Sequence, residues 1–241
     1  MFADSLEHVE ILDIPVGLDR TQESTIFASI REALAELQAG RMIVIVDDED
    51  REDEGDLMIA AEMITPEAIN FMATRARGLI CMAITSERAD ALELSPMVLQ
   101  NTSWGGTAFT VSVDAKGRGV TTGISAYDRT QTVLAIVDAH TRPEDLARPG
   151  HIFPLCARRN GVLERRGHTE AAVDLARLAG LDSSGVICEI ANDDGAMAGL
   201  PDLIRFCSKC ALKMVSVADA ARYRSEFARQ AADASALMFA G

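Results

Sequence analysis

The sequence contains few aromatic residues, and its basic residues are in the minority. Eight phenylalanines, two tyrosines and one tryptophan occur among 241 residues, which leaves little material for stacking nucleobases. The 23 lysines and arginines are outnumbered by 37 aspartates and glutamates, and the formal net charge is −14. Nucleic acids and anionic membranes attract basic surfaces, so we predict neither as a partner.

Cysteines and long hydrophobic runs are also scarce. Five irregularly spaced cysteines do not suit a disulfide framework, which favours a reducing compartment. The first twenty residues alternate charged with apolar side chains, unlike a secretory signal. Apolar runs such as residues 42–46 are far too short to span a bilayer. We therefore expect a cytoplasmic protein.

The composition is that of a globular enzyme, with 48% hydrophobic residues to build a core. Extended and helical segments alternate along the chain. Strands are expected at residues 41–46, 57–64, 79–85, 109–113, 151–157 and 185–191, and helices at residues 66–77, 127–139 and 169–179. This alternation predicts one α/β (α+β) domain in which helices flank a mixed sheet.

The ends of the chain are less regular than its middle. Ser24 is expected to cap a first helix that ends at Gly40, and a helix, a strand and a helix are expected within residues 200–229. Residues 1–20 are interpreted as an N-terminal extension, residues 21–230 as the folded domain, and residues 231–241 as a weakly patterned tail.

Half of the net charge is concentrated in residues 47–56, whose sequence is DDEDREDEGD. The run lies between two apolar extended segments, so it is expected to form a short loop held at both ends by the sheet. Like charges on such a loop repel one another unless cations lie nearby. The run favours a divalent-metal site, and a solvated acidic face is the alternative.

A basic segment, ARRNGVLERRGH at residues 157–168, leads directly into the helix expected from Thr169. Arginines, a glycine and a threonine at a helix N-terminus suit an anion such as a phosphate. A surface helix cap with scattered arginines explains the same pattern equally well. An isolated pair, Cys207 and Cys210, has no second pair nearby and is interpreted as structural.

The pattern R-x-G-H occurs twice, at residues 148–151 and 165–168, and uses two of only four histidines. Histidine together with carboxylates suits Mg²⁺ or Mn²⁺ better than structural zinc. Glu189 ends an apolar strand, where a carboxylate is costly unless it is paired or catalytic. The residues alone therefore favour a metal-assisted enzyme that acts on a small phosphorylated substrate, with the reaction left open.

Five segments, DDEDREDEGD, GVTTGISAYDR, RPGHIFPL, RRGHTEAAVDLARLAG and GVICEIANDDG, together resemble the 3,4-dihydroxy-2-butanone-4-phosphate synthase family of riboflavin biosynthesis. The resemblance extends from about Ile26 to Arg229. It implies a single three-layer domain and conversion of D-ribulose 5-phosphate to formate and L-3,4-dihydroxy-2-butanone 4-phosphate. It also implies a homodimer with active sites at the interface, and Mg²⁺ or Mn²⁺, with two ions per site.

The same resemblance assigns roles to individual residues. Glu52 and His168 are expected to bind the metal, and His151, Glu189 and Asp56 to take part in catalysis. The residues expected at the substrate are Arg51, Asp56, Thr122, Asp128, Arg165, Arg166, Gly167, Thr169 and Glu189. Arg129 is expected to line the same pocket, with some of these residues crossing the dimer, and Cys81 to lie nearby.

The implied chemistry suits these residue types. Forming an enediol beside a carbonyl needs a base and a group that stabilises the developing oxyanion. Many relatives carry a fused GTP cyclohydrolase II domain, and we expect the chain to be monofunctional. A metal-dependent phosphosugar isomerase or phosphatase, and a non-catalytic binding domain, remain as alternatives. Asn160 departs from the family pattern, in which glycine is common before GVL.

Overall fold

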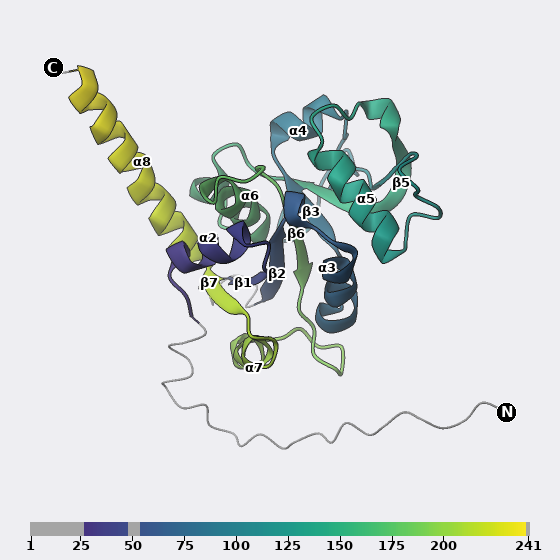
Figure 1. Ribbon diagram of the computed structural model, residues 1–241, viewed down its shortest axis with the longest axis horizontal. Coiled ribbons are helices and arrows are strands. Elements are labelled where there is room, and N and C mark those ends of the chain that lie inside the picture. Colours follow the sequence, from purple (N-terminus) through teal and green to yellow (C-terminus); the bar gives the residue numbers. More distant parts are fainter. Residues whose placement is uncertain (1–26, 48–53, 240–241) are drawn as a thin grey trace.

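The computed structural model describes residues 27–47 and 54–239. Its centre is a mixed sheet of seven strands in the order β4-β5-β3-β6-β2-β1-β7 (Figure 1). The strands are β1 (Ile43–Val46), β2 (Gly55–Ala60), β3 (Cys81–Ile84), β4 (Val113–Ala115), β5 (Leu146–Cys156), β6 (Gly185–Glu189) and β7 (Lys213–Ser216). The pairs β1–β7 and β3–β5 are parallel and the other four are antiparallel.

Helices cover both faces of this sheet, as expected for a three-layer domain (Figure 1). On one face pack α2 (Ile30–Gln38), α6 (His168–Leu178) and the start of α8 (Val217–Phe239). On the other pack α3 (Pro66–Phe71), α4 (Ser86–Ala91), α5 (Ala126–Val137) and α7 (Leu200–Cys210). Four short turns complete the fold: η1 (Ala61–Met63), η2 (Met72–Ala76), η3 (Pro143–Asp145) and η4 (Gly161–Leu163).

The alternation of side chains along each strand explains the two layers of core. In β1, Ile43 and Ile45 pack toward α6, whereas Val44 and Val46 pack toward the opposite helices. All four are buried, because the strand lies inside the sheet. The uncharged, β-branched sequence that predicted this strand is therefore the sequence that two apolar layers require.

Several expected boundaries were wrong; the strand expected at residues 57–64, for example, is β2 (Gly55–Ala60). The first described helix, α2, is capped by Ser29, whose hydroxyl accepts a hydrogen bond from Glu32 N in a capping box, and Ser24 lies outside the described residues. The strand expected at residues 109–113 forms only bridges until β4 begins at Val113. Helix α8 continues to Phe239, beyond its expected end at Arg229.

The fold places the N-terminus of α6 beside the ends of β2 and β6. Helix α6 contacts β1, β2, β3 and β6, and its first nine residues are buried. Asp56 of β2 lies opposite Glu189 of β6 in the antiparallel ladder. The described ends of the acidic run, the end of the basic segment and the strand-end glutamate, which are distant in sequence, therefore meet in one place. Within residues 27–47 and 54–239, no helix is long and apolar enough to cross a membrane.

Candidate active site

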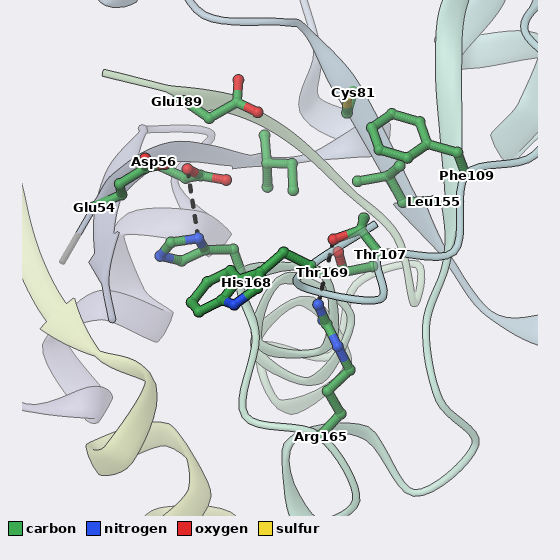
Figure 2. A pocket seen from close by; sticks show the side chains of 12 residues that line it. Glu54, Asp56, Cys81, Thr107, Phe109, Leu155, Arg165, His168, Thr169 and Glu189 are labelled. Carbon is green, nitrogen blue, oxygen red and sulfur yellow. Dashed lines mark hydrogen bonds and ion pairs between the residues drawn. The ribbon is translucent and has the colours of Figure 1, made fainter. Parts of the chain in front are cut away.

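A cavity of about 490 Å³ lies beside the N-terminus of α6 (Figure 2). Strands β2, β3, β5 and β6 contribute to it, together with the segment that precedes β4. Its lining combines ionisable, hydroxyl and apolar side chains: Glu54, Asp56, Cys81, Trp104, Thr107, Phe109, Leu155, Arg165, His168, Thr169, Ile187 and Glu189. Convergent polar groups in a cavity of this size are typical of an active site for a small molecule.

His168, the first residue of α6, is held between two carboxylates. Its Nε2 lies 3.4 Å from Asp47 Oδ1, and its Nδ1 lies 3.5 Å from Asp56 Oδ1. The His168 side chain is only 8% exposed, and both aspartates are buried as well. An imidazole and two carboxylates removed from water form a strongly polar centre, which a cation or a charged ligand would stabilise.

Arg165 and the start of α6 form a corner of the cavity that is rich in hydrogen-bond donors. Arg165 Nη1 donates a hydrogen bond to Glu170 Oε2 at 2.6 Å, and Nη2 donates to Gly105 O at 2.8 Å. Thr169 is buried in the first turn of α6, whose N-terminal amides point toward the cavity end of the helix. A phosphate placed here would meet a guanidinium, a hydroxyl and a helix N-terminus.

Gly167 permits the close approach of these groups. It occupies the N-cap position of α6, and a Cβ atom there would lie 2.2 Å from Arg165 Nη1 and 3.0 Å from Glu170 Oε2. Any other residue would therefore push the guanidinium away from its carboxylate partner. Glycine at this position therefore leaves room for the ion pair between Arg165 and Glu170.

Glu189 and Asp56 lie near each other and both line the cavity (Figure 2). Glu189 Oε2 accepts a hydrogen bond from the backbone N–H of Leu79 at 2.8 Å, which fixes the orientation of the carboxylate. Cys81 lies nearby, and burial raises the pKa of its thiol well above the usual range, with the charges of Glu189 and Asp56 adding to the effect. Cys81 is therefore a protonated wall residue at neutral pH.

A second cluster surrounds His151, which does not line this cavity. His151 Nδ1 lies 2.8 Å from Asp114 Oδ2, and its backbone N–H donates to Asp114 Oδ1 at 2.9 Å. The imidazole is 41% exposed. An Nδ1–H tautomer, which the Asp114 carboxylate favours, leaves Nε2 available as a base in contact with solvent.

The loop before α5 completes this second cluster. Asp128 accepts hydrogen bonds from Thr121 Oγ1 at 2.9 Å and from Gly123 N at 3.0 Å. Burial acts to raise the pKa of the Asp128 carboxyl, but these hydrogen bonds outweigh it and hold the pKa below its usual range. A Cβ at Gly123 would lie 2.1 Å from Asp114 Oδ2, so the loop packs directly on the histidine–aspartate pair.

Comparison with known proteins decides the family. Residues 31–223 match the sequence profile of 3,4-dihydroxy-2-butanone 4-phosphate synthase. The chain belongs to the 3,4-dihydroxy-2-butanone 4-phosphate synthase family. It is 57% identical over 204 residues to the riboflavin biosynthesis protein RibBA of Synechocystis sp., and 56% identical over 199 residues to that of Aquifex aeolicus. These alignments cover 84% and 82% of the chain but only 37% and 49% of the relatives.

Solved structures of the synthase family share the fold. A 3,4-dihydroxy-2-butanone 4-phosphate synthase in complex with two magnesium ions is 40% identical, with a TM-score of 0.80 over 83% of this chain and 98% of that one. RibBX from A. baumannii, a two-domain synthase, is 50% identical with a TM-score of 0.78, over 82% of this chain and 58% of that one. These structures confirm the expected mixed α/β domain.

The synthase fold gathers some of the expected residues and separates others. The cavity contains Asp56, Arg165, His168, Thr169 and Glu189. Thr122, Asp128, Arg129 and His151 lie with the second cluster or on α5, and none of them is among the residues that line this cavity. Arg166 also differs from expectation, because it lines a separate groove against α8. Arg51 and Glu52 lie outside the described residues.

Sequence reasoning missed several residues of these two regions. Asp114 orients His151 but belongs to a short strand with no motif, 37 positions earlier in the chain. Thr107, Phe109 and Trp104 contribute a wall of the cavity. The segment containing them has one distinctive residue in sequence, the only tryptophan of the chain, and it belongs to none of the five motifs.

The donors around His168 fit a hard divalent cation in kind. Buried aspartates next to an imidazole supply the mixed oxygen and nitrogen set that Mg²⁺ or Mn²⁺ accepts. Among the residues that the structure describes, no three His, Cys, Asp or Glu side chains are grouped as a metal site requires. Glu52, the expected partner of His168, lies between Asp47 and Glu54 in the acidic run.

Proposed function

We propose that this chain converts D-ribulose 5-phosphate to L-3,4-dihydroxy-2-butanone 4-phosphate and formate, a step of riboflavin biosynthesis. One observation carries the proposal: the anion-binding corner at Arg165 and the buried group of His168, Asp56 and Glu189 line the same cavity. Family membership supports the choice of this reaction over a phosphosugar isomerase or a phosphatase, which would use the same kinds of groups.

The phosphate of the substrate would occupy the corner formed by Arg165, Gly167 and Thr169. The guanidinium provides charge-assisted hydrogen bonds, and the α6 N-terminus provides amides that point at the anion. Glu170 keeps the guanidinium in place through its 2.6 Å hydrogen bond. The sugar chain would then extend toward Asp56 and Glu189, which would hold its hydroxyl groups.

Proton transfer requires a base beside the carbon that loses its proton. Glu189 is positioned inside the cavity by Leu79 N, and His151 is oriented by Asp114. We assign catalytic roles to Glu189, His151 and Asp56 in moving protons during enediol formation and rearrangement. Apolar side chains of Phe109, Leu155 and Ile187 would limit the entry of water to reactive intermediates.

Glu52 and His168 would hold a pair of Mg²⁺ or Mn²⁺ ions in this cavity. Such ions, when bound, would stabilise the negative charge that develops on the substrate oxygens. The chain's own contribution is to keep His168 buried and oriented by Asp47 and Asp56. Arg51 next to Glu52 would lie beside the substrate.

A homodimer would complete this site. His151, Thr122 and Asp128 belong to the synthase motifs, yet none of them lines the cavity of their own chain. Ile124 and Tyr127, beside the second cluster, are large apolar residues that are about half exposed. These observations support a dimer in which the His151 cluster of each chain faces the cavity of the other.

The proposal concerns the synthase reaction alone, for which the matched residues 31–223 account. We propose the cytoplasm as its location, because the five cysteines, all within the described residues, are free thiols. No nucleic acid or membrane partner is proposed.

The test is a product assay on the purified chain. Incubation with ribulose 5-phosphate and Mg²⁺ should release formate in equal amount with a four-carbon phosphate ester, measured by carbon and phosphorus NMR. A five-carbon phosphate product would indicate an isomerase, and inorganic phosphate would indicate a phosphatase. Either product without formate, from folded protein, would refute the proposed reaction.

A further inference from the structure

The segment 101–107 forms a closed loop at the cavity. Asn101 Nδ2 donates a hydrogen bond to Thr107 O at 2.9 Å, and Asn101 Oδ1 accepts one from Ser103 N at 2.9 Å. Gly106, with φ of +63°, donates its N–H to Ser103 O at 3.1 Å. These hydrogen bonds hold residues 101–107 together, so the loop can move as a unit.

Arg165 joins this loop to the anion-binding corner. Its Nη2 donates to Gly105 O at 2.8 Å and lies 3.3 Å from Thr107 Oγ1, in a contact that Figure 2 marks with a dashed line. Its Nη1 donates to Glu170 Oε2, at the first turn of α6. A guanidinium has five N–H donors in a rigid plane. An anion bound to some of these donors therefore alters the hydrogen bonds that the others make to the loop and to Glu170.

Trp104 stands in the middle of this loop. It lines the cavity, and it is nevertheless 83% exposed. A large aromatic residue so exposed at the rim of a polar cavity gains from covering a ligand, because its indole then exchanges water for apolar and polar contacts. None of the motifs recognised in the sequence contains this residue.

We propose that Trp104 is a positioning residue that covers a phosphorylated ligand when Arg165 holds its phosphate. Arg165 is the physical link, since the same guanidinium contacts the loop backbone, Thr107 and Glu170. Closing the indole over the cavity orients the ligand and removes water from it, which suits chemistry with reactive enediol intermediates. This inference rests on the proposed function in one respect, the phosphate at Arg165.

Because the chain contains one tryptophan, its fluorescence reports this loop directly. The probe is inorganic phosphate, titrated into the full chain against sodium chloride of equal ionic strength. We expect the acrylamide quenching constant of Trp104 to fall by roughly half on saturation, with emission moving to shorter wavelength, because the indole becomes shielded from water. Ribulose 5-phosphate should produce the same change at lower concentration.

Variants at Thr107 distinguish the contact between Arg165 and the loop from the positive charge of Arg165. Thr107→Val removes the hydroxyl contact with Arg165, whereas Thr107→Ser keeps it, and both keep the contact of Arg165 with Gly105 O. Thr107→Val should reduce the fluorescence response measurably while phosphate binding, measured by calorimetry, weakens by only about 2- to 10-fold, the range for one hydrogen bond. Thr107→Ser should respond like the parent. Arg222→Met, on α8 and away from the cavity, controls for loss of a surface arginine.

Trp104 itself is tested by affinity. Trp104→Ala should weaken phosphate binding by about 3- to 10-fold, and Trp104→Phe should restore most of the loss, as expected for an aromatic contact. Phosphate binding without any fluorescence change in the parent chain would overturn the inference, and so would the absence of phosphate binding.

Failure of the proposed function is recognised separately. A fluorescence response to ribulose 5-phosphate without formate would retain the Trp104 inference and refute the proposed reaction. Formate release with an unresponsive indole would do the opposite.

Discussion

The two R-x-G-H segments have the same pattern and quite different surroundings. His168 begins a helix, is buried, and lies between two carboxylates, whereas His151 belongs to strand β5, is 41% exposed, and pairs with one. Arg165 points into the cavity, while Arg148 donates hydrogen bonds to the backbone carbonyls of Leu92, Pro143 and Leu146.

The difference shows that a four-residue pattern does not determine a role. At residues 165–168 the arginine lines the cavity, although it also donates hydrogen bonds to Glu170, Gly105 O and Thr107 Oγ1. At residues 148–151 the arginine binds backbone carbonyl groups, so only the histidine can take part in catalysis. We infer that one segment supplies binding charge and a metal ligand, and the other supplies a solvent-facing base.

The largest loss of activity is expected from substitutions that remove the metal ligands, His168 of the buried segment (residues 165–168) and its expected partner Glu52. His168→Ala should reduce formate release by about 10³-fold or more, as should Glu52→Gln, because each removes a member of a group that acts as a unit. Formate release at saturating ribulose 5-phosphate and Mg²⁺ measures this, with circular dichroism to show retained fold. His140→Ala, which alters an exposed histidine on a distant turn, is the control. Full turnover by Glu52→Gln would contradict its metal role.

Substitutions in the exposed segment (residues 148–151) and at its partner Asp114 should reduce activity somewhat less. His151→Asn should lower kcat by about 10²- to 10⁴-fold, the usual contribution of a general acid or base. Asp114→Asn should lower it by about 10- to 100-fold, because the imidazole remains but loses its orienting carboxylate. Steady-state kinetics over a range of pH compare the two. An Asp114→Asn variant with an unchanged pH profile would show that the aspartate has only a structural role.

The two adjacent arginines allow a smaller and sharper comparison. Arg165→Lys should raise KM by about 10- to 100-fold, since a lysine cannot reproduce the forked contacts to phosphate and Glu170. Arg166→Lys should change KM by less than about threefold, because Arg166 lines the groove against α8. Equal effects of the two substitutions on KM would contradict this division.

The smallest effect concerns stability and pH at the second cluster. The lowered pKa of Asp128 means that its ionised form favours folding above its unfolded pKa of about 4, and that this contribution is lost as pH falls through the lower folded pKa. Asp128→Asn should therefore lower Tm at neutral pH, with the gap to the parent narrowing below about pH 4. Thermal denaturation from neutral pH to about pH 3 measures the gap, and a constant gap would refute this origin.

Sequence reasoning succeeded where one segment determines its own structure. The start of α6 follows from the local pattern. Ser29 and Glu32 also have the spacing of a capping box, although the cap was expected at Ser24.

Prediction from sequence failed where tertiary contacts determine the structure. Asp114 meets His151 through the pairing of β4 with β5, and the adjacent residues Arg165 and Arg166, which precede α6, line different cavities. Alternation at residues 109–113 indicated a strand, but only bridges form before Val113.

The most direct test of the account is complementation between two inactive variants. In the proposed dimer, each site combines the His168 cavity of one chain with the His151 cluster of the other. A mixed dimer of His168→Ala and His151→Asn chains therefore contains one site in which both histidines are intact. After unfolding and refolding a 1:1 mixture, formate release should recover to about a quarter of the parent activity per chain, as random pairing requires. Activity that stays at the sum of the two separate variants would contradict a site built from both chains.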